Sequence, residues 1–221
     1  IDRGGAERLM RRSVELARSA RDGASAPAWV AASVGPYGAM LPHGEEYVGR
    51  YGLTVAALTA WHRPRLEVLN AAEPDVLALE TIPDSDEAHA LVGLVREFRT
   101  PAWLSYTIAG DRTRAGQPLA EAFAVAADVP EIVAVGVNCC APADVLGAVI
   151  TARQVTGKPV IVYPNSGEVW DGINRTWLGT PGMDTGQATD WVDAGARIVG
   201  GCCRVRPADI EIGRASCRER V

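Results

Sequence analysis

The sequence predicts an α/β fold of the (β/α)8 TIM-barrel type. Six short apolar segments alternate with segments of helical periodicity, and strict alternation of this kind is typical of a parallel sheet. The apolar segments are rich in β-branched residues and nearly continuous in apolarity, as in strands buried on both faces. Polar and reactive side chains end five of them. A barrel gathers all its strand ends around one opening, whereas a doubly wound sheet, the alternative, gathers ligands at one switch point.

Each predicted strand is an apolar run that ends in a polar or glycine-rich turn. The six strands are residues 28–35, 75–82, 102–108, 132–139, 159–166 and 197–203. An eight-stranded barrel needs two more, and the chain opens on a helix with no strand before it. We therefore expect a fragment that lacks the first two strands of the barrel, with unpaired edges at 28–35 and 197–203.

Segments with apolar residues at helical spacing precede and separate these strands. Ser85, which two acidic residues follow, and Asp144 stand near expected helix N-termini, and Gly157 and Gly195 stand where helices should end. The predicted helices are residues 6–22, 54–72, 85–98, 118–128, 143–156 and 185–194. We place Trp29 in the core, and we expect Trp170 and Trp177 in a long loop that covers the pocket.

Composition and charge exclude several classes of protein. Of the 221 residues, 48% are apolar and 22% charged, which is ordinary for a globular domain with a sizeable core. No apolar run approaches the roughly 18 residues that cross a bilayer. The net charge is −5 and no basic face is evident, so we expect neither a membrane nor a nucleic-acid partner.

We expect one domain over residues 1–211. Residues 212–221 abandon the apolar periodicity and carry three arginines, so we interpret them as a non-native or mis-joined tail. The five cysteines are two adjacent pairs, Cys139–Cys140 and Cys202–Cys203, and Cys217 in the tail. This spacing does not suit a disulfide framework. It favours reduced thiols in the cytoplasm, kept for metal binding or chemistry.

Three thiols are predicted to meet at the barrel mouth, because Cys139 ends one strand and Cys202 and Cys203 end another. Three thiolates match a catalytic zinc site whose fourth position stays open. The preceding Gly200–Gly201 pair gives the backbone freedom to turn both adjacent thiols toward one ion. Spacing alone does not choose between Cys139 and Cys140, and buried structural cysteines are the alternative. Such a zinc site carries a charge of about −1, which favours a soft thiol as fourth ligand and alkyl transfer over hydrolysis.

With these residues the chain resembles the zinc-dependent homocysteine S-methyltransferase family, and most closely its bacterial members that use S-methylmethionine or S-adenosylmethionine. The resemblance spans nearly residues 6–210. The motifs that carry it are ASVGPYGA (32–39), EYVGRYGL (46–53), WHRPR (61–65), ETIP (80–83), GVNC (136–139), YPNSGE (163–168) and VGGCC (199–203).

The resemblance implies a function and a set of site residues. A methyl group would pass from the sulfonium donor to the thiol of homocysteine and give methionine. Zn²⁺ would be held by Cys139, Cys202 and Cys203. Glu80 would hold the substrate amino group, with Asn138 and Asn165 shaping the pocket. The family's first strand ends in Asp-Gly-Gly, whose Asp helps to bind homocysteine, and no such segment is present here. The alternative function is a barrel protein with a structural or storage site of three cysteines and no methyl transfer.

Overall fold

A computed structural model describes residues 1–42, 44–171, 174, 176–182 and 185–210. Within these ranges, six strands form one parallel sheet in the order β1-β2-β3-β6-β7-β10. These strands are β1 (Ala31–Val34), β2 (Val76–Ile82), β3 (Ala102–Tyr106), β6 (Ile132–Asn138), β7 (Val160–Tyr163) and β10 (Ala196–Val199). The predicted α/β fold with a parallel sheet is thus confirmed, and β1 and β10 are its outer strands. Closure into an eight-stranded barrel and the absence of two strands stay predictions, and the proposed tail, with Cys217, lies outside the described residues.

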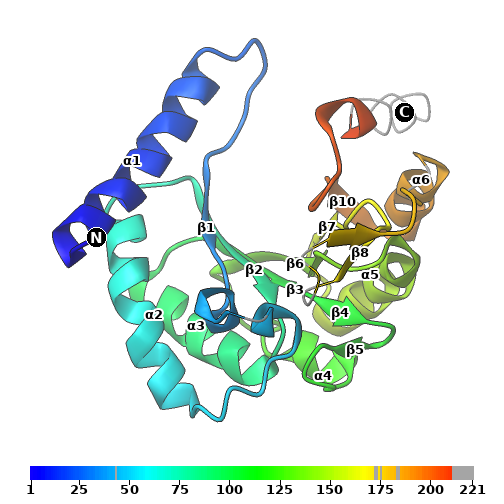
Figure 1. The fold of residues 1–221 in the computed structure, drawn as a ribbon, viewed down its shortest axis with the longest axis horizontal. Helices are drawn as coiled ribbons and strands as arrows, with labels where there is room; N and C mark the ends of the chain where they lie inside the picture. The colour runs from blue at the N-terminus through cyan, green and yellow to red at the C-terminus, as the bar shows by residue number, and fades with distance from the viewer. Residues whose placement is uncertain (43, 172–173, 175, 183–184, 211–221) are drawn as a thin grey trace.

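In the described part of the chain, six helices lie on the outside of the strands, which occupy the centre of the molecule (Figure 1). Their bounds are α1 (Arg3–Asp22), α2 (Val55–Asn70), α3 (Ser85–Phe98), α4 (Leu119–Ala124), α5 (Pro142–Thr156) and α6 (Thr185–Ala194). Each lies where helical periodicity predicts it. The N-cap of α3 is Asp84, whose carboxylate accepts a hydrogen bond from the backbone N–H of Asp86. Gly157 ends α5 in the left-handed conformation, as predicted.

Two short antiparallel hairpins and two 3₁₀ turns among the described residues were not predicted. The first hairpin, β4 (Ile108–Ala109) with β5 (Arg112–Thr113), follows β3. The second, β8 (Val169–Asp171) with β9 (Thr176–Leu178), follows β7. The turns are η1 (Tyr37–Met40) and η2 (Glu45–Tyr47). Strands of two or three residues are too short to show a period of two. Of the hairpin residues, the sequence predicts only Ile108, at the end of the predicted strand 102–108, to be in a strand.

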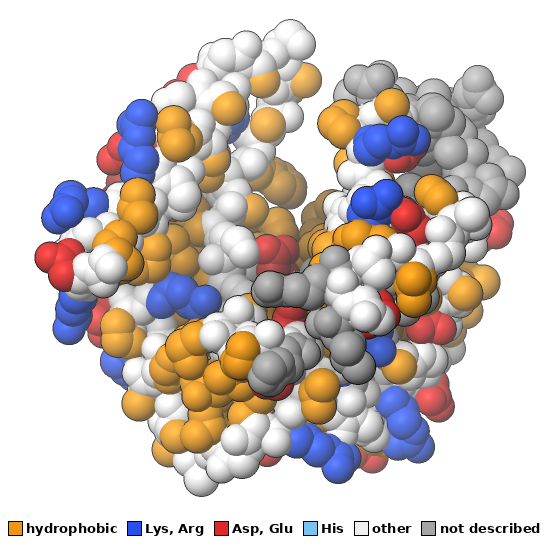
Figure 2. Space-filling view, in the orientation of Figure 1, with side chains coloured by type: hydrophobic (Ala, Val, Ile, Leu, Met, Phe, Trp, Pro, Cys, Tyr) orange, Lys and Arg blue, Asp and Glu red, His pale blue; other side chains and the backbone are white. Residues whose placement is uncertain are grey.

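One continuous apolar core fills the space between the sheet and the helices. Trp29 does not belong to it: the prediction was wrong, because its side chain is 77% exposed on the link between α1 and β1. Figure 2 shows the surface hollowed between α1 with its link to β1 and the described residues that follow β10. Among the described residues, no helix is both long and apolar enough to span a bilayer.

Gly136 is required by the sheet beneath the candidate site. A Cβ atom at this position of β6 would lie 1.7 Å from the carbonyl oxygen of Ile161 in β7. We expect Gly136→Ala to lower the free energy of unfolding by about 3 kcal/mol, because the two strands must separate. The matched control is Gly147→Ala in α5, where a Cβ meets no atom within 4 Å. This change should raise the free energy of unfolding by about 0.5–1 kcal/mol. Urea unfolding of both variants tests this, and equal stabilities would contradict it.

Candidate metal centre

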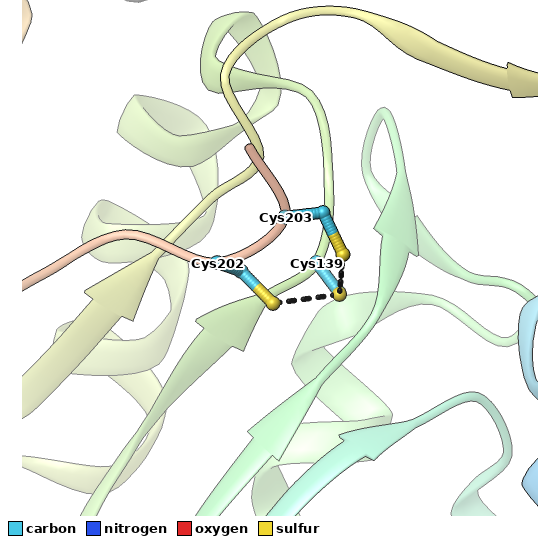
Figure 3. A group of neighbouring side chains, drawn as sticks. All are labelled: Cys139, Cys202 and Cys203. Carbon is cyan, nitrogen blue, oxygen red and sulfur yellow. Dashed lines mark hydrogen bonds between the residues drawn. The ribbon is translucent and has the colours of Figure 1, made fainter. Parts of the chain in front are cut away.

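Three thiols from two distant parts of the chain converge at the C-terminal ends of the strands. Cys139 directly follows β6, and Cys202 and Cys203 lie on the segment after β10 (Figure 3). The Sγ atom of Cys139 lies 2.8 Å from that of Cys202 and 3.7 Å from that of Cys203. All three sulfur atoms lie within 4.8 Å of one another, and all four cysteines of the described chain are free thiols.

The segment after β10 turns sharply, which allows adjacent thiols to face the same point. A Cβ atom at Gly201 would lie 2.2 Å from the side chain of Val205, so only glycine permits this turn. The backbone N–H of Val205 donates to the carbonyl oxygen of Cys202. In an extended strand the two thiols would point to opposite faces. The turn therefore brings them together, as the Gly-Gly pair predicts.

Cys139 has a backbone conformation that is uncommon for a residue with a side chain. Its φ is +50°, in the left-handed region that costs a non-glycine residue about 1–2 kcal/mol. Two hydrogen bonds hold it there: its N–H donates to the carbonyl oxygen of Tyr163, and the Thr107 hydroxyl donates to its carbonyl oxygen. This conformation is specific to Cys139 among the two adjacent cysteines. The neighbouring Cys140 is buried, and the pKa of its thiol is raised by that burial.

The geometry of the cluster fits a tetrahedral metal ion with thiolate ligands. Zn–S bonds of about 2.3 Å place two sulfur atoms about 3.8 Å apart in a tetrahedral site. The separation between Cys139 and Cys203 already has this value, at 3.7 Å. The 2.8 Å separation between Cys139 and Cys202 must widen by about 1 Å, a movement within reach of a side-chain rotation. Three sulfur donors also suit a soft ion such as zinc rather than magnesium or calcium.

The thiols perturb one another's ionisation. Hydrogen bonds with Cys139 and then with Cys202 lower the pKa of the Cys203 thiol. Hydrogen bonding with Cys139 is also the largest of the causes that raise the pKa of the Cys202 thiol. The cluster on its own therefore favours one shared negative charge, and a divalent cation is needed to stabilise three thiolates together.

A cavity of about 200 Å³ adjoins Cys139. Its walls include two aromatic side chains, Tyr47 and Trp170, together with Asn165 and Glu168. The Tyr47 hydroxyl lies 3.5 Å from the Sγ atom of Cys139. Burial, and then the charge of Cys139, raises the pKa of this phenol, so it stays protonated. Trp170 packs against Trp177 across the hairpin, with ring centroids 5.3 Å apart and the ring planes tilted by 51°. The predicted covering loop is thus a hairpin that contributes one cavity wall.

Glu80 lies at the end of β2, and both its carboxylate oxygens accept hydrogen bonds. The Ser33 hydroxyl of β1 donates to Oε1 at 2.5 Å, and the Tyr163 hydroxyl of β7 donates to Oε2 at 3.0 Å. The Trp103 indole donates to the Tyr163 oxygen in turn. Tyr163 also accepts the backbone hydrogen bond of Cys139. It therefore connects the Glu80 carboxylate to the thiol cluster, a role that the sequence does not reveal.

The two predicted asparagines have different surroundings. Asn165 lines the cavity, and its side-chain oxygen accepts the backbone N–H of Cys203. Asn138 is buried and bonds Thr81 twice: its Oδ1 accepts from the backbone N–H, and its Nδ2 donates to the hydroxyl. It thereby ties the ends of β6 and β2 beside the thiols. Substrate contacts by Glu80, Asn138 and Asn165 stay predictions.

A buried polar group anchors the loop that carries Tyr47. His62 of α2 and Glu87 of α3 are fully buried, and the His62 Nε2 atom lies 2.8 Å from the Glu87 Oε1 atom. That oxygen also accepts the backbone N–H of Tyr37, at the start of η1. Arg65 completes the group by donating to the carbonyl oxygen of Gly35 and contacting the His62 ring. The sequence places His62 on a helix but gives no sign of this contact with a residue 25 positions away.

Acid should weaken this anchor. Burial lowers the pKa of His62 below its usual value near 6.5, and the charge of Arg65 adds to this effect. The unfolded chain therefore takes up the proton first, so stability falls as the pH decreases below about 6.5. We expect His62 to add up to about 1.4 kcal/mol per pH unit to the slope of the free energy of unfolding against pH. In urea unfolding, the free energy of unfolding of His62→Gln should fall less steeply between pH 7.5 and 5.5 than that of the wild type. An unchanged slope would contradict the assignment.

Comparison with known proteins gives the same family along nearly the whole chain. The family model described as homocysteine S-methyltransferase matches residues 2–216. The homocysteine S-methyltransferase of Escherichia coli is 42% identical over 222 residues, which cover 95% of this chain and 71% of that protein. Homocysteine S-methyltransferase 4 of Zea mays is 42% identical over 240 residues, covering 99% of this chain and 70% of the relative.

A solved structure agrees with these sequence matches. The metallated form of the homocysteine methyltransferase MmuM from Escherichia coli superposes with a TM-score of 0.86 at 38% sequence identity. The match covers 98% of this chain and 73% of that one. Sequence, fold and the cluster of three thiols therefore agree, and the chain belongs to the homocysteine S-methyltransferase family.

Proposed function

We propose that this protein transfers a methyl group from a sulfonium donor, S-methylmethionine or S-adenosylmethionine, to the thiol of homocysteine and so forms methionine. The observation that carries the proposal is the convergence of three free thiols beside a cavity, in a chain of this family. Three sulfur ligands leave one tetrahedral position for a fourth, and a substrate thiol suits it.

Cys139, Cys202 and Cys203 would hold Zn²⁺, which when bound keeps a substrate thiol deprotonated yet nucleophilic. The chain's own residues bind and orient the amino acid. Glu80 would accept the ammonium group of homocysteine, and the hydrogen bonds from Ser33 and Tyr163 keep its carboxylate in one orientation. A carboxylate held in this way binds a cation without first losing side-chain freedom.

The cavity beside Cys139 would receive the donor. A sulfonium carries a positive charge, which the faces of Tyr47 and Trp170 attract. The homocysteine sulfur attacks the methyl carbon, and a carbon–sulfur bond forms as the methyl–sulfonium bond breaks. The electron pair of the broken bond stays on the leaving sulfur, which departs as a neutral thioether. It needs no proton, so the protein's task is to position the two sulfur atoms in line.

Methionine formation from homocysteine and each donor tests the function directly. We expect activity with at least one sulfonium donor, loss of activity after metal removal by a chelator, and recovery when zinc is added back.

Since free thiols and the reduced Cys140 suit a reducing compartment, we propose the cytoplasm as the place of the reaction.

A second measurement separates catalysis from metal storage. X-ray absorption at the zinc edge should show a fourth sulfur neighbour only when homocysteine is present. Zinc coordination that does not respond to homocysteine, together with no methionine from either donor, would instead support a structural or storage site.

A further inference from the structure

We propose that the ion pair between Glu168 and Arg204 positions the two adjacent thiols and thereby sets the metal affinity of the site. Glu168 ends the YPNSGE segment after β7, and Arg204 directly follows Cys203. The inference rests on the proposed binding of zinc by the three thiols. It assigns a positioning role to two residues that contribute no ligand atom.

The pair is close and largely shielded on its acidic side. The Arg204 Nε atom donates to the Glu168 Oε2 atom at 2.7 Å, and the Ser166 hydroxyl donates to the same oxygen at 2.8 Å. The Glu168 side chain is 8% exposed, whereas that of Arg204 is 48% exposed. Within the described ranges, Arg204 is the one basic residue that forms an ion pair with Glu168. Its removal would leave a nearly buried carboxylate without a counter-charge.

The pair completes a set of contacts that attaches the thiol segment to the loop after β7. The N–H of Cys202 donates to the carbonyl oxygen of Pro164, and the N–H of Ser166 donates to that of Cys203. The N–H of Cys203 donates to the Asn165 side chain. These bonds hold the backbone up to Cys203, and the Glu168–Arg204 contact fixes the residue that follows. Together they restrain both sides of the second thiol.

The backbone at Arg204 needs such a restraint. Its φ is +63°, in the left-handed region that is disfavoured for a residue with a Cβ atom. The guanidinium also lies over the Trp177 ring, 5.8 Å from its centroid, so it contacts the β8–β9 hairpin as well as Glu168. Two anchored contacts thus maintain a strained turn that starts at the metal-binding thiols.

Glu168 also connects this contact to the cavities on both sides of it. It lines the 200 Å³ cavity beside Cys139, and it lines a second cavity of about 190 Å³ together with Arg204. The Glu168–Arg204 contact therefore borders solvent-accessible space as well as the thiol segment. Loss of the ion pair would let the segment move, and zinc affinity should fall for that reason.

The test compares Glu168→Gln, Arg204→Gly and the double variant. Glycine accepts the left-handed conformation, so Arg204→Gly removes the guanidinium without adding backbone strain. We expect each single variant to bind zinc about 10–100-fold more weakly, as measured by competition with a chromophoric chelator. The double variant should bind zinc no more weakly than the weaker-binding of the two single variants, because each single change removes the same contact. Absorption spectra of the cobalt-loaded proteins should show altered thiolate geometry.

Arg206→Met is the matched control. Arg206 lies two residues further along the same segment and forms an exposed ion pair with Asp209, and exposed pairs contribute little. The zinc affinity of the Arg206→Met variant should stay within about 2-fold of the wild-type value.

Wild-type zinc affinity in both single variants would overturn the proposal. So would additive losses in the double variant, or losses matched by equal destabilisation of the metal-free protein, since these indicate a general effect on folding. A wild-type protein that binds no zinc would overturn this proposal and the zinc-dependent function together. Zinc binding without methionine formation would contradict the methyl transfer alone, because zinc affinity is measured here without substrate.

Discussion

Cys202→Ala is expected to abolish methionine formation and to lower zinc affinity about 10²- to 10³-fold. Structural zinc sites bind with apparent free energies of about 10–16 kcal/mol, which is about 2.5–4 kcal/mol for each of four ligands. The sulfur of Cys202 lies in a group whose other members are Cys139 and Cys203. Cys139→Ala and Cys203→Ala should therefore have the same effect. Zinc content by mass spectrometry and methionine formation are the two measurements.

Cys140→Ala provides the control for this prediction. Cys140 is a buried member of the apolar core and does not belong to the cluster of three sulfur atoms. Its loss removes only a small apolar side chain, so zinc stoichiometry should stay close to one ion per chain. Zinc that is retained in Cys202→Ala and lost in Cys140→Ala would contradict the ligand assignment.

Glu80→Gln is expected to raise the KM for homocysteine about 10- to 100-fold while zinc stays bound. The change keeps the size of the side chain and one carbonyl oxygen, but it removes the negative charge that would face the substrate ammonium. Hydrogen bonds to charged groups contribute about 1.5–3 kcal/mol, which corresponds to this range. Steady-state kinetics at saturating donor give KM and kcat separately.

A glutamate outside the site serves as the comparison for Glu80. Glu121 is an exposed residue of α4, and Glu121→Gln should leave both kinetic constants unchanged. A KM for Glu80→Gln equal to that of the wild type would show that the carboxylate only joins Ser33 and Tyr163 at the strand ends.

Much of the local structure could be predicted because its signals are local. Each of the six predicted strands overlaps an observed strand, and α3 has the predicted bounds Ser85–Phe98. Apolar periodicity and helix-ending glycines act over a few residues, so they can be read along the chain. The hairpin strands have two or three residues, which is too short for such a pattern. Trp29 was misplaced because exposure depends on what covers a residue rather than on its type.

The sequence by itself determined the parallel α/β arrangement and the meeting of one thiol of the Cys139–Cys140 pair with Cys202 and Cys203, because both follow from strand ends that share one edge of a sheet. Spacing left the choice within that pair open, and the structure places Cys139 in the cluster. Only the tertiary structure decided the partners of each side chain. Tyr163 reaches Glu80 across 83 positions, and Arg204 reaches Glu168 across 36. Such contacts depend on strand register and on loop conformation, which the packing of the whole sheet sets and no short window of sequence records.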